Sequence, residues 1–219
     1  MQRYFVKGIV SETSHSLEFS KDQIHQLKKV MRMKVEEQFE IVDENSTLAL
    51  VELVCLEPFE VRVIKTLNQK VELPVFTAIA VGLSKGDKLD WIVQKATELG
   101  VNEIIPIEMS RNVVKWNKDK ASKKTERLQK IAEEASEQSH RLKVPFISDV
   151  MTIESLIEYT KSYHQKLIAY EEAAKEGETV QLVKSLQALK AGEKIVFVFG
   201  PEGGIDNKEV AKLQLNEFH

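Results

Sequence analysis

The sequence has few of the features that mark secreted, membrane or metal-cluster proteins. It has 1 cysteine, Cys55, so an internal disulfide or a multi-cysteine metal site is excluded. With 9 glycines and 5 prolines in 219 residues, it is neither collagen-like nor of low complexity. No stretch approaches the roughly 18 apolar residues of a membrane span, and the first ten residues lack the apolar core of a signal peptide. We therefore expect a cytoplasmic protein with no membrane partner.

A large excess of charge of one sign is also absent. The net charge of −3 excludes a polycation that coats nucleic acid. Two local windows are nevertheless basic, residues 21–34 and residues 110–143, and together they are suited to holding a phosphate backbone. Trp116 lies in the second window and could stack on a base. The alternative is a solvated helix face with pairs such as Lys130 and Glu134.

The first third of the chain is predicted to be strand-rich. Residues 3–10, 38–42, 48–56 and 59–67 are rich in β-branched and aromatic side chains and are separated by turn-like clusters. One helix is expected over residues 21–33, where Ser20 and Gln23 have the spacing of a capping box. Several short strands in about 70 residues indicate a small β-barrel.

The remainder alternates between strands and helices. Strands are expected at 75–83, 103–107, 144–148, 166–171 and 194–199, and the intervening segments have helical periodicity, with helices at 125–138, 153–159, 180–189 and 207–215. Gly100 stands where a left-handed helix cap belongs. This alternation predicts an α/β domain with a mainly parallel sheet, so we expect two domains, 1–72 and 73–219.

The strongest local motif is a glycine-rich turn, 200–204, between a buried strand and a helix. Asp206 and Glu209 have capping-box spacing at the start of that helix. Ligands of open α/β sheets bind beyond the carboxyl ends of strands, and glycines let the backbone approach them closely. The alternative is a plain tight turn. Neither the dinucleotide nor the P-loop pattern is present.

The other chemistry-bearing residues are scattered. The five histidines share no metal-ligand spacing, so no metal site is predicted. His140 beside Arg141 could donate to phosphate, or it could simply belong to a helix end. Arg111 and Lys115 follow a strand and lie in a predicted loop, where functional residues concentrate.

Taken together, these segments resemble the ribosomal RNA small subunit methyltransferase E family of knotted (SPOUT) enzymes, which methylate N3 of a uridine in 16S rRNA. The matching segments keep the order of the family along the chain. They are MQRYFV at the start, HQLKKVMRMKV at 25–35, GLSKGDKLDWIVQKATELGV at 82–101, RNVVKW at 111–116, EEASEQSHR at 133–141 and FGPEGGIDNKEV at 199–210. Glu36-Glu37 departs from the Gly-Asp usual in the family.

The resemblance implies a fold and an assembly. It implies an N-terminal PUA-like barrel that helps to hold RNA, and a C-terminal trefoil-knot domain that binds S-adenosylmethionine (SAM) and forms a homodimer. Family members continue beyond the position of His219 into a segment that completes the cofactor pocket, the knot and the dimer interface. The resemblance therefore implies that the knot is incomplete in this 219-residue chain.

The resemblance also implies site residues. Arg111 would orient the uridine or its phosphate, and Glu202 would accept a proton or hold its loop. The cofactor would contact Tyr170, Glu171, Gly200, Pro201, Glu202, Gly203, Gly204 and Ile205. Ribosomal RNA, free or in the small subunit, would contact Arg3, His25, Arg32, Lys85, Arg111, Lys115, Trp116, His140 and Arg141. Two other readings stay open, a non-catalytic RNA-binding protein and a small-molecule enzyme of the doubly wound class.

Overall fold

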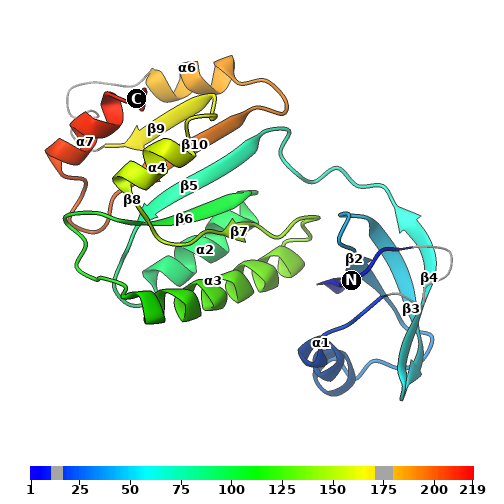
Figure 1. Cartoon of the computed structure of the whole chain (residues 1–219). Helices are drawn as coiled ribbons and strands as arrows, with labels where there is room; N and C mark the ends of the chain where they lie inside the picture. Colours follow the sequence, from blue (N-terminus) through cyan, green and yellow to red (C-terminus); the bar gives the residue numbers. More distant parts are fainter. Residues whose placement is uncertain (11–16, 171–179) are drawn as a thin grey trace. The chain divides into compact units, whose positions relative to one another are not determined.

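The computed structural model describes residues 1–10, 17–170 and 180–219, with the backbone alone for 118–120. The chain forms two compact units (Figure 1). Unit 1 comprises Met1–Glu72 and Ser136–Lys143, and unit 2 comprises Leu73–Ala135 and Val144–His219. The segment Ser136–Lys143, which we expected within the second domain, thus groups with unit 1.

Unit 1 is built on a four-stranded sheet. Its strands are β1 (Arg3–Phe5), β2 (Gln38–Val42), β3 (Leu48–Leu56) and β4 (Phe59–Leu67), in the order β1-β2-β3-β4. β1 pairs with β2 in parallel, and the other neighbours are antiparallel. Among the described residues β4 does not pair with β1, so the sheet is open where we expected a closed barrel. Tyr4, Leu27 and Phe39 form the centre of its core.

The helical segment of unit 1 differs from the single helix expected over 21–33. An α-helix, α1 (Lys21–His25), passes into a π-helix, η1 (Gln26–Val30). The predicted capping box is confirmed, because the Ser20 hydroxyl accepts from the Gln23 N–H and the Gln23 side chain accepts from the Ser20 N–H. Arg32 has φ of 52°, which ends the helical segment before residue 33.

Unit 2 contains the parallel sheet that the alternation predicted. Its strands are β5 (Phe76–Gly82), β6 (Glu103–Glu108), β7 (Phe146–Ile147), β8 (Met151–Thr152), β9 (Gln165–Ala169) and β10 (Lys194–Phe199). The order is β7-β6-β5-β10-β9, with β8 also paired to β6, and every one of these pairs is parallel. The two-residue strand β8 was not expected, because two residues carry no readable periodicity.

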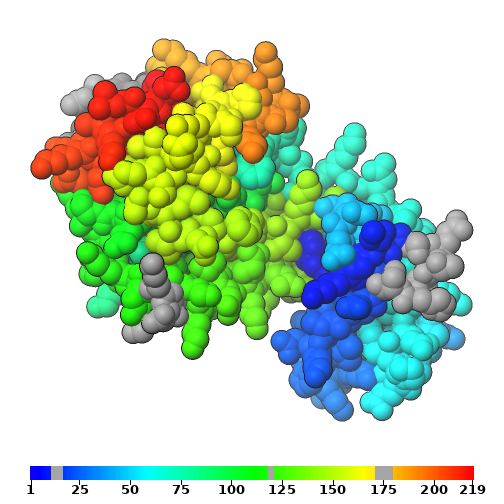
Figure 2. Space-filling view, in the orientation of Figure 1, coloured from blue at the N-terminus to red at the C-terminus, as the bar shows by residue number. Residues whose placement is uncertain are grey.

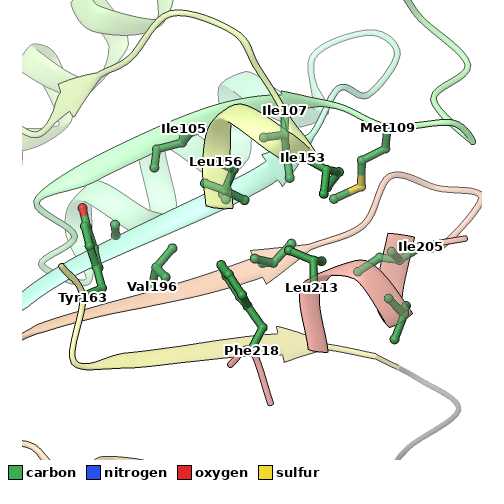
Figure 3. Packing of buried hydrophobic residues seen from close by; sticks show 14 residues of the cluster. Ile105, Ile107, Met109, Ile153, Leu156, Tyr163, Val196, Ile205, Leu213 and Phe218 are labelled. Carbon is green, nitrogen blue, oxygen red and sulfur yellow. The ribbon is translucent and has the colours of Figure 1, made fainter. Parts of the chain in front are cut away.

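Helices cover both faces of this sheet. They are α2 (Lys88–Glu98), α3 (Lys118–Gln138), α4 (Ile153–Tyr159), α6 (Gln181–Ala188) and α7 (Asn207–Gln214). α2 and α3 bury Leu89, Val93 and Leu128 against one face. On the other face, α4 and α7 bury Leu156 and Leu213 in the core shown in Figure 3. α3 begins earlier than the predicted residue 125.

Two further features follow from these helices. Gly100, with φ of 99°, adopts the left-handed conformation predicted for it just after α2. α4 (yellow-green) and α7 (red) lie side by side at the surface (Figure 2), and Lys212 of α7 pairs with Glu154 of α4. That hydrogen bond lowers the pKa of Glu154 to about 2. In the described part of the chain, no helix combines the length and apolarity needed to cross a bilayer.

Candidate functional site

The glycine-rich loop 200–204 lies at the carboxyl end of β10, the strand between β5 and β9. Crevices beyond the carboxyl ends of such strands are the usual ligand sites of open α/β sheets. Gly82, the last residue of β5, permits the loop to approach, because a β-carbon there would lie 2.6 Å from Pro201 Cδ. No other residue type fits at position 82 without moving the loop.

The loop forms one wall of a cavity of about 760 Å³. The remaining walls come from the ends of β9 and β10, from Arg111 and from Asn207 at the start of α7. The hydroxyl of Tyr170 donates to Asn207 Oδ1 at 3.0 Å and so links two of these walls. The expected cofactor residues that line the cavity are Tyr170, Gly200, Pro201, Glu202, Gly203, Gly204 and Ile205. Glu171 lies outside the described residues.

Arg111 is held at the edge of this cavity by the first turn of α7. Its guanidinium donates to the Gly203 carbonyl and to Asp206 Oδ2, each at 3.3 Å. The preceding residue, Ser110, donates from its N–H and its hydroxyl to the Glu209 carboxylate, at 2.8 and 3.1 Å. Asp206 and Glu209 also form the predicted capping box of α7. The residues that cap the helix therefore position the arginine too.

Glu202 holds the loop to a neighbouring segment. Its Oε1 accepts from the Lys85 N–H at 3.3 Å and lies 3.2 Å from Lys88 Nζ. A hydrogen bond from its own backbone N–H, with contributions from Lys88 and Lys85, lowers the pKa of Glu202. An ionised carboxylate held in this way is suited to an anchoring role and is a weak proton acceptor.

Several residues predicted to bind RNA are exposed. His25 and Arg32 are exposed in unit 1, as is His140, whose side chain is 47% accessible. Lys85 and Lys115 are exposed in unit 2. These positions are compatible with RNA contacts. Trp116 is half-buried against the core under α2 and α3, and Lys124 Nζ lies 4.7 Å from the centroid of its ring.

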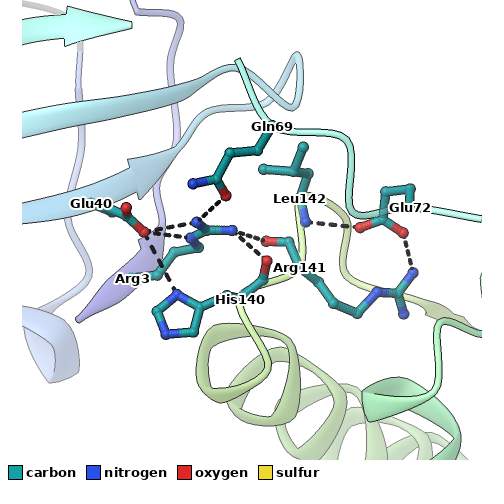
Figure 4. Close-up of polar contacts among 7 residues, drawn as sticks. All are labelled: Arg3, Glu40, Gln69, Glu72, His140, Arg141 and Leu142. Carbon is teal, nitrogen blue, oxygen red and sulfur yellow. Dashed lines mark hydrogen bonds and ion pairs between the residues drawn. The ribbon is translucent and has the colours of Figure 1, made fainter. Parts of the chain in front are cut away.

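Arg3 and Arg141 are placed differently, since both are buried in unit 1, 2% and 4% exposed (Figure 4). Arg3 donates from Nε and Nη2 to the same oxygen of Glu40, Oε2, at 2.9 and 2.8 Å, and it also bonds to Gln69 and to the carbonyls of residues 140 and 141. Arg141 pairs with Glu72 at 2.6 Å. The direct RNA contact expected of these two arginines does not fit this burial, because their donors are turned to partners inside the unit.

Three contributors to the site were missed by sequence reasoning. Lys88, Ser110 and Asn207 act only through partners distant in the chain, Glu202, Glu209 and Tyr170 respectively. Of these three, only Ser110 could have been found from the sequence, because it closely follows the end of a predicted strand, where ligand sites of α/β sheets lie. Within the described ranges, no group of three or more His, Cys, Asp or Glu side chains is arranged to hold a metal ion.

Unit 2 therefore has a parallel sheet, a glycine-lined cavity at the carboxyl ends of its strands and an arginine fixed at the rim of that cavity. These features define a ligand-binding α/β domain. Residues 71–219, which include all of unit 2, match the family model of the RNA methyltransferase domain, so the chain belongs to the RNA methyltransferases. The chain is also 39% identical, over 97% of its length and 85% of the relative's, to the ribosomal RNA small subunit methyltransferase E of Bacillus subtilis. The chain belongs to the ribosomal RNA small subunit methyltransferase E family, as its motifs predicted.

Solved structures are similar in fold. A ribosomal RNA small subunit methyltransferase E from Neisseria gonorrhoeae, bound to SAM, has a TM-score of 0.84 and 24% identity, and the match covers 100% of this chain and 87% of that one. A methyltransferase from Legionella pneumophila, in complex with SAM, has a TM-score of 0.83 and 25% identity, with coverage of 99% and 86%. Both share the α/β architecture described above.

Proposed function

We propose that this protein transfers a methyl group from SAM to N3 of a uridine in 16S rRNA. The observation that carries the proposal is the glycine-lined cavity with Arg111 fixed at its rim, in a chain of this family. The SAM-bound relative from Legionella supports the identity of the cofactor.

The residues of the cavity fit SAM. A volume of about 760 Å³ is within the range of small-molecule sites, and the exposed glycines Gly203 and Gly204 leave the backbone accessible. Tyr170 and the loop 200–205 would hold the cofactor, with Glu171 expected beside them. SAM supplies an electrophilic methyl group on a sulfonium, so the protein has to contribute mainly alignment.

Arg111 is proposed as the catalytic residue. Its guanidinium orients the uridine or its phosphate and stabilises the enolate-like oxygen that develops as the N3 proton passes to solvent water. Its contacts with Gly203 and Asp206 fix it before substrate arrives, which lowers the entropic cost of reaching the reactive geometry. For Glu202 we favour the anchoring role over that of proton acceptor, because its carboxylate is already engaged.

The RNA is proposed to contact His25, Arg32 and His140 of unit 1 and Lys85, Lys115 and Trp116 of unit 2. The trefoil knot, the homodimer and the cytoplasmic location remain predictions from the family resemblance. Binding that depends on these cations should weaken steeply with salt.

Transfer of tritiated methyl from SAM to 16S rRNA, or to small subunits, tests the proposal, with mapping of the modified base. Arg111→Ala should abolish transfer without unfolding the protein, because the side chain is 45% exposed. Lys95→Ala, which removes an exposed cation paired with Glu98 on α2, is the matched control and should retain activity. Unchanged turnover in Arg111→Ala would remove Arg111 from the site, and salt-sensitive RNA binding without transfer would favour the non-catalytic reading.

A further inference from the structure

A second cavity, of about 250 Å³, lies in unit 2 beside the cofactor cavity. Two segments connect the cavities. The loop 84–86 lines the second cavity, and its Lys85 N–H donates to Glu202 of the first. Segment 111–116 contributes Arg111 to the first cavity and Val114 and Trp116 to the second. A ligand of the second cavity would therefore lie near the reacting base.

The walls of the second cavity combine apolar and cationic groups. Leu89 and Leu128, 3% and 2% exposed, pack with the Trp116 ring on the core side. Lys85, Lys124 and Arg127 provide the positive charge, and Lys124 Nζ lies over the indole. Of the described residues that line the cavity, Asp90 is the one acid, and it is paired with Arg127. An aromatic and apolar wall beside cations is the arrangement that takes a base together with its phosphate.

Two polar atoms strengthen this interpretation. Ser84 Oγ and Trp116 Nε1 are buried and have no hydrogen-bond partner within the described part of the chain. Buried hydroxyls and indole N–H groups nearly always have partners, so each unpaired one needs an explanation. Both residues line this cavity. A nucleotide carries acceptors on its base, its sugar and its phosphate that could pair with these two atoms. Because the indole N–H lies in the plane of the ring, its acceptor would stand beside the ring and not above it.

We propose that this cavity receives one unpaired nucleotide of the RNA, next to the nucleotide that is methylated. The base takes the position over the indole that the Lys124 ammonium occupies, and Lys124 and Lys85 pair with the phosphate. A cavity of about 250 Å³ is small beside the 760 Å³ of the cofactor cavity, which fits a single base. The inference rests on the proposed function, because it needs RNA as the substrate.

The first test uses steady-state methyl transfer to 16S rRNA, with KM for RNA and kcat measured separately. Trp116→Leu should raise KM for RNA by about ten-fold or more, because the base loses its stacking partner. Trp116→Phe should have a KM close to that of the wild-type, because its ring can still stack. Lys124→Ala should raise KM for RNA several-fold. It should also make the plot of log association constant for RNA against log salt concentration less steep, by about one unit of slope. Lys123→Ala is the matched control, because Lys123 is exposed on the same helix and does not line the cavity. SAM affinity, measured by calorimetry without RNA, should be the same in all four.

The second test is a binding signal independent of turnover. The chain has 2 tryptophans, so Trp91→Phe leaves Trp116 as the one indole reporter. Unlabelled RNA should quench its fluorescence, and Trp116→Phe, which retains the exposed Trp91, should show little quenching.

The outcomes separate the two proposals. No transfer by the wild-type protein would overturn the proposed function itself. If the wild-type is active but Lys124→Ala changes KM no more than Lys123→Ala does, and RNA does not quench Trp116, the nucleotide site is overturned. Because Lys124 is exposed, Lys124→Ala should fold normally. It therefore tests the nucleotide site even if Trp116→Leu fails to fold.

Discussion

Replacing Arg3 by methionine should destabilise unit 1 strongly, because Arg3 is buried with an ionised partner. Its guanidinium bonds to Glu40, to Gln69 and to two backbone carbonyls, and the residue is 2% exposed. Removing the arginine leaves Glu40, itself 9% exposed, as a buried charge that has lost both of the hydrogen bonds that Arg3 donates to its Oε2. Breaking a buried pair in this way costs about 3–5 kcal/mol, a large part of the roughly 5–15 kcal/mol that stabilises a domain.

The matched control is Arg62→Met in the same unit. Arg62 pairs with Glu52 at 2.5 Å, but its side chain is 64% exposed. Exposed pairs of this kind contribute about 0.2–1 kcal/mol. The two variants remove the same functional group from unit 1 and differ mainly in burial, so their difference measures the effect of burial.

Hydrogen exchange monitored by mass spectrometry is the suitable assay, because peptides from β2 and β3 report on unit 1 and peptides from β5 and β10 report on unit 2. Arg3→Met should accelerate exchange in the unit 1 peptides far more than Arg62→Met does. The double variant Arg3→Met/Glu40→Met should recover most of the loss, since apolar residues can replace a buried pair at little cost. If Arg3→Met were no more destabilising than Arg62→Met, the structural role assigned to Arg3 would be refuted, and an RNA contact would regain support.

Three further predictions concern the site. Glu202→Gln should weaken SAM binding several-fold in calorimetry. It should leave the pH–rate profile unchanged, because the lowered pKa keeps the Glu202 carboxylate ionised across the neutral range. If the variant instead lost one limb of that profile, Glu202 would be identified as the proton acceptor. Asp206→Asn should preserve the cap of α7 and hence the melting temperature but reduce methyl transfer through Arg111, whereas Asp206→Ala should also cost about 1 kcal/mol of stability. Gly203→Val should reduce SAM affinity, because a β-carbon there would lie 3.1 Å from the Arg111 carbonyl oxygen; normal affinity would show that the loop does not bind cofactor.

The sequence predicted those parts of the structure that depend on local patterns. The parallel sheet and both capping boxes follow from periodicity and spacing within a few residues. The roles of Arg3 and Arg141 could not be read in this way, since a basic residue in a basic window looks the same whether it faces solvent or a buried carboxylate. Likewise, the link between Lys88 and Glu202 joins segments that only the folded sheet brings together.

The position of β10 has a consequence for how the protein is made. β10 lies between β5 and β9 and pairs residue 194 with residue 76, so an interior place of the sheet is filled by the strand that is synthesised last among those described. Until β10 leaves the ribosome, β5 and β9 each present an unpaired edge, the kind of surface that promotes aggregation of nascent chains. The same strand leads into the glycine-rich loop, so the wall that this loop gives to the cavity forms only once β10 has joined the sheet. SAM can therefore stabilise the finished domain by mass action but cannot guide the folding of its earlier strands.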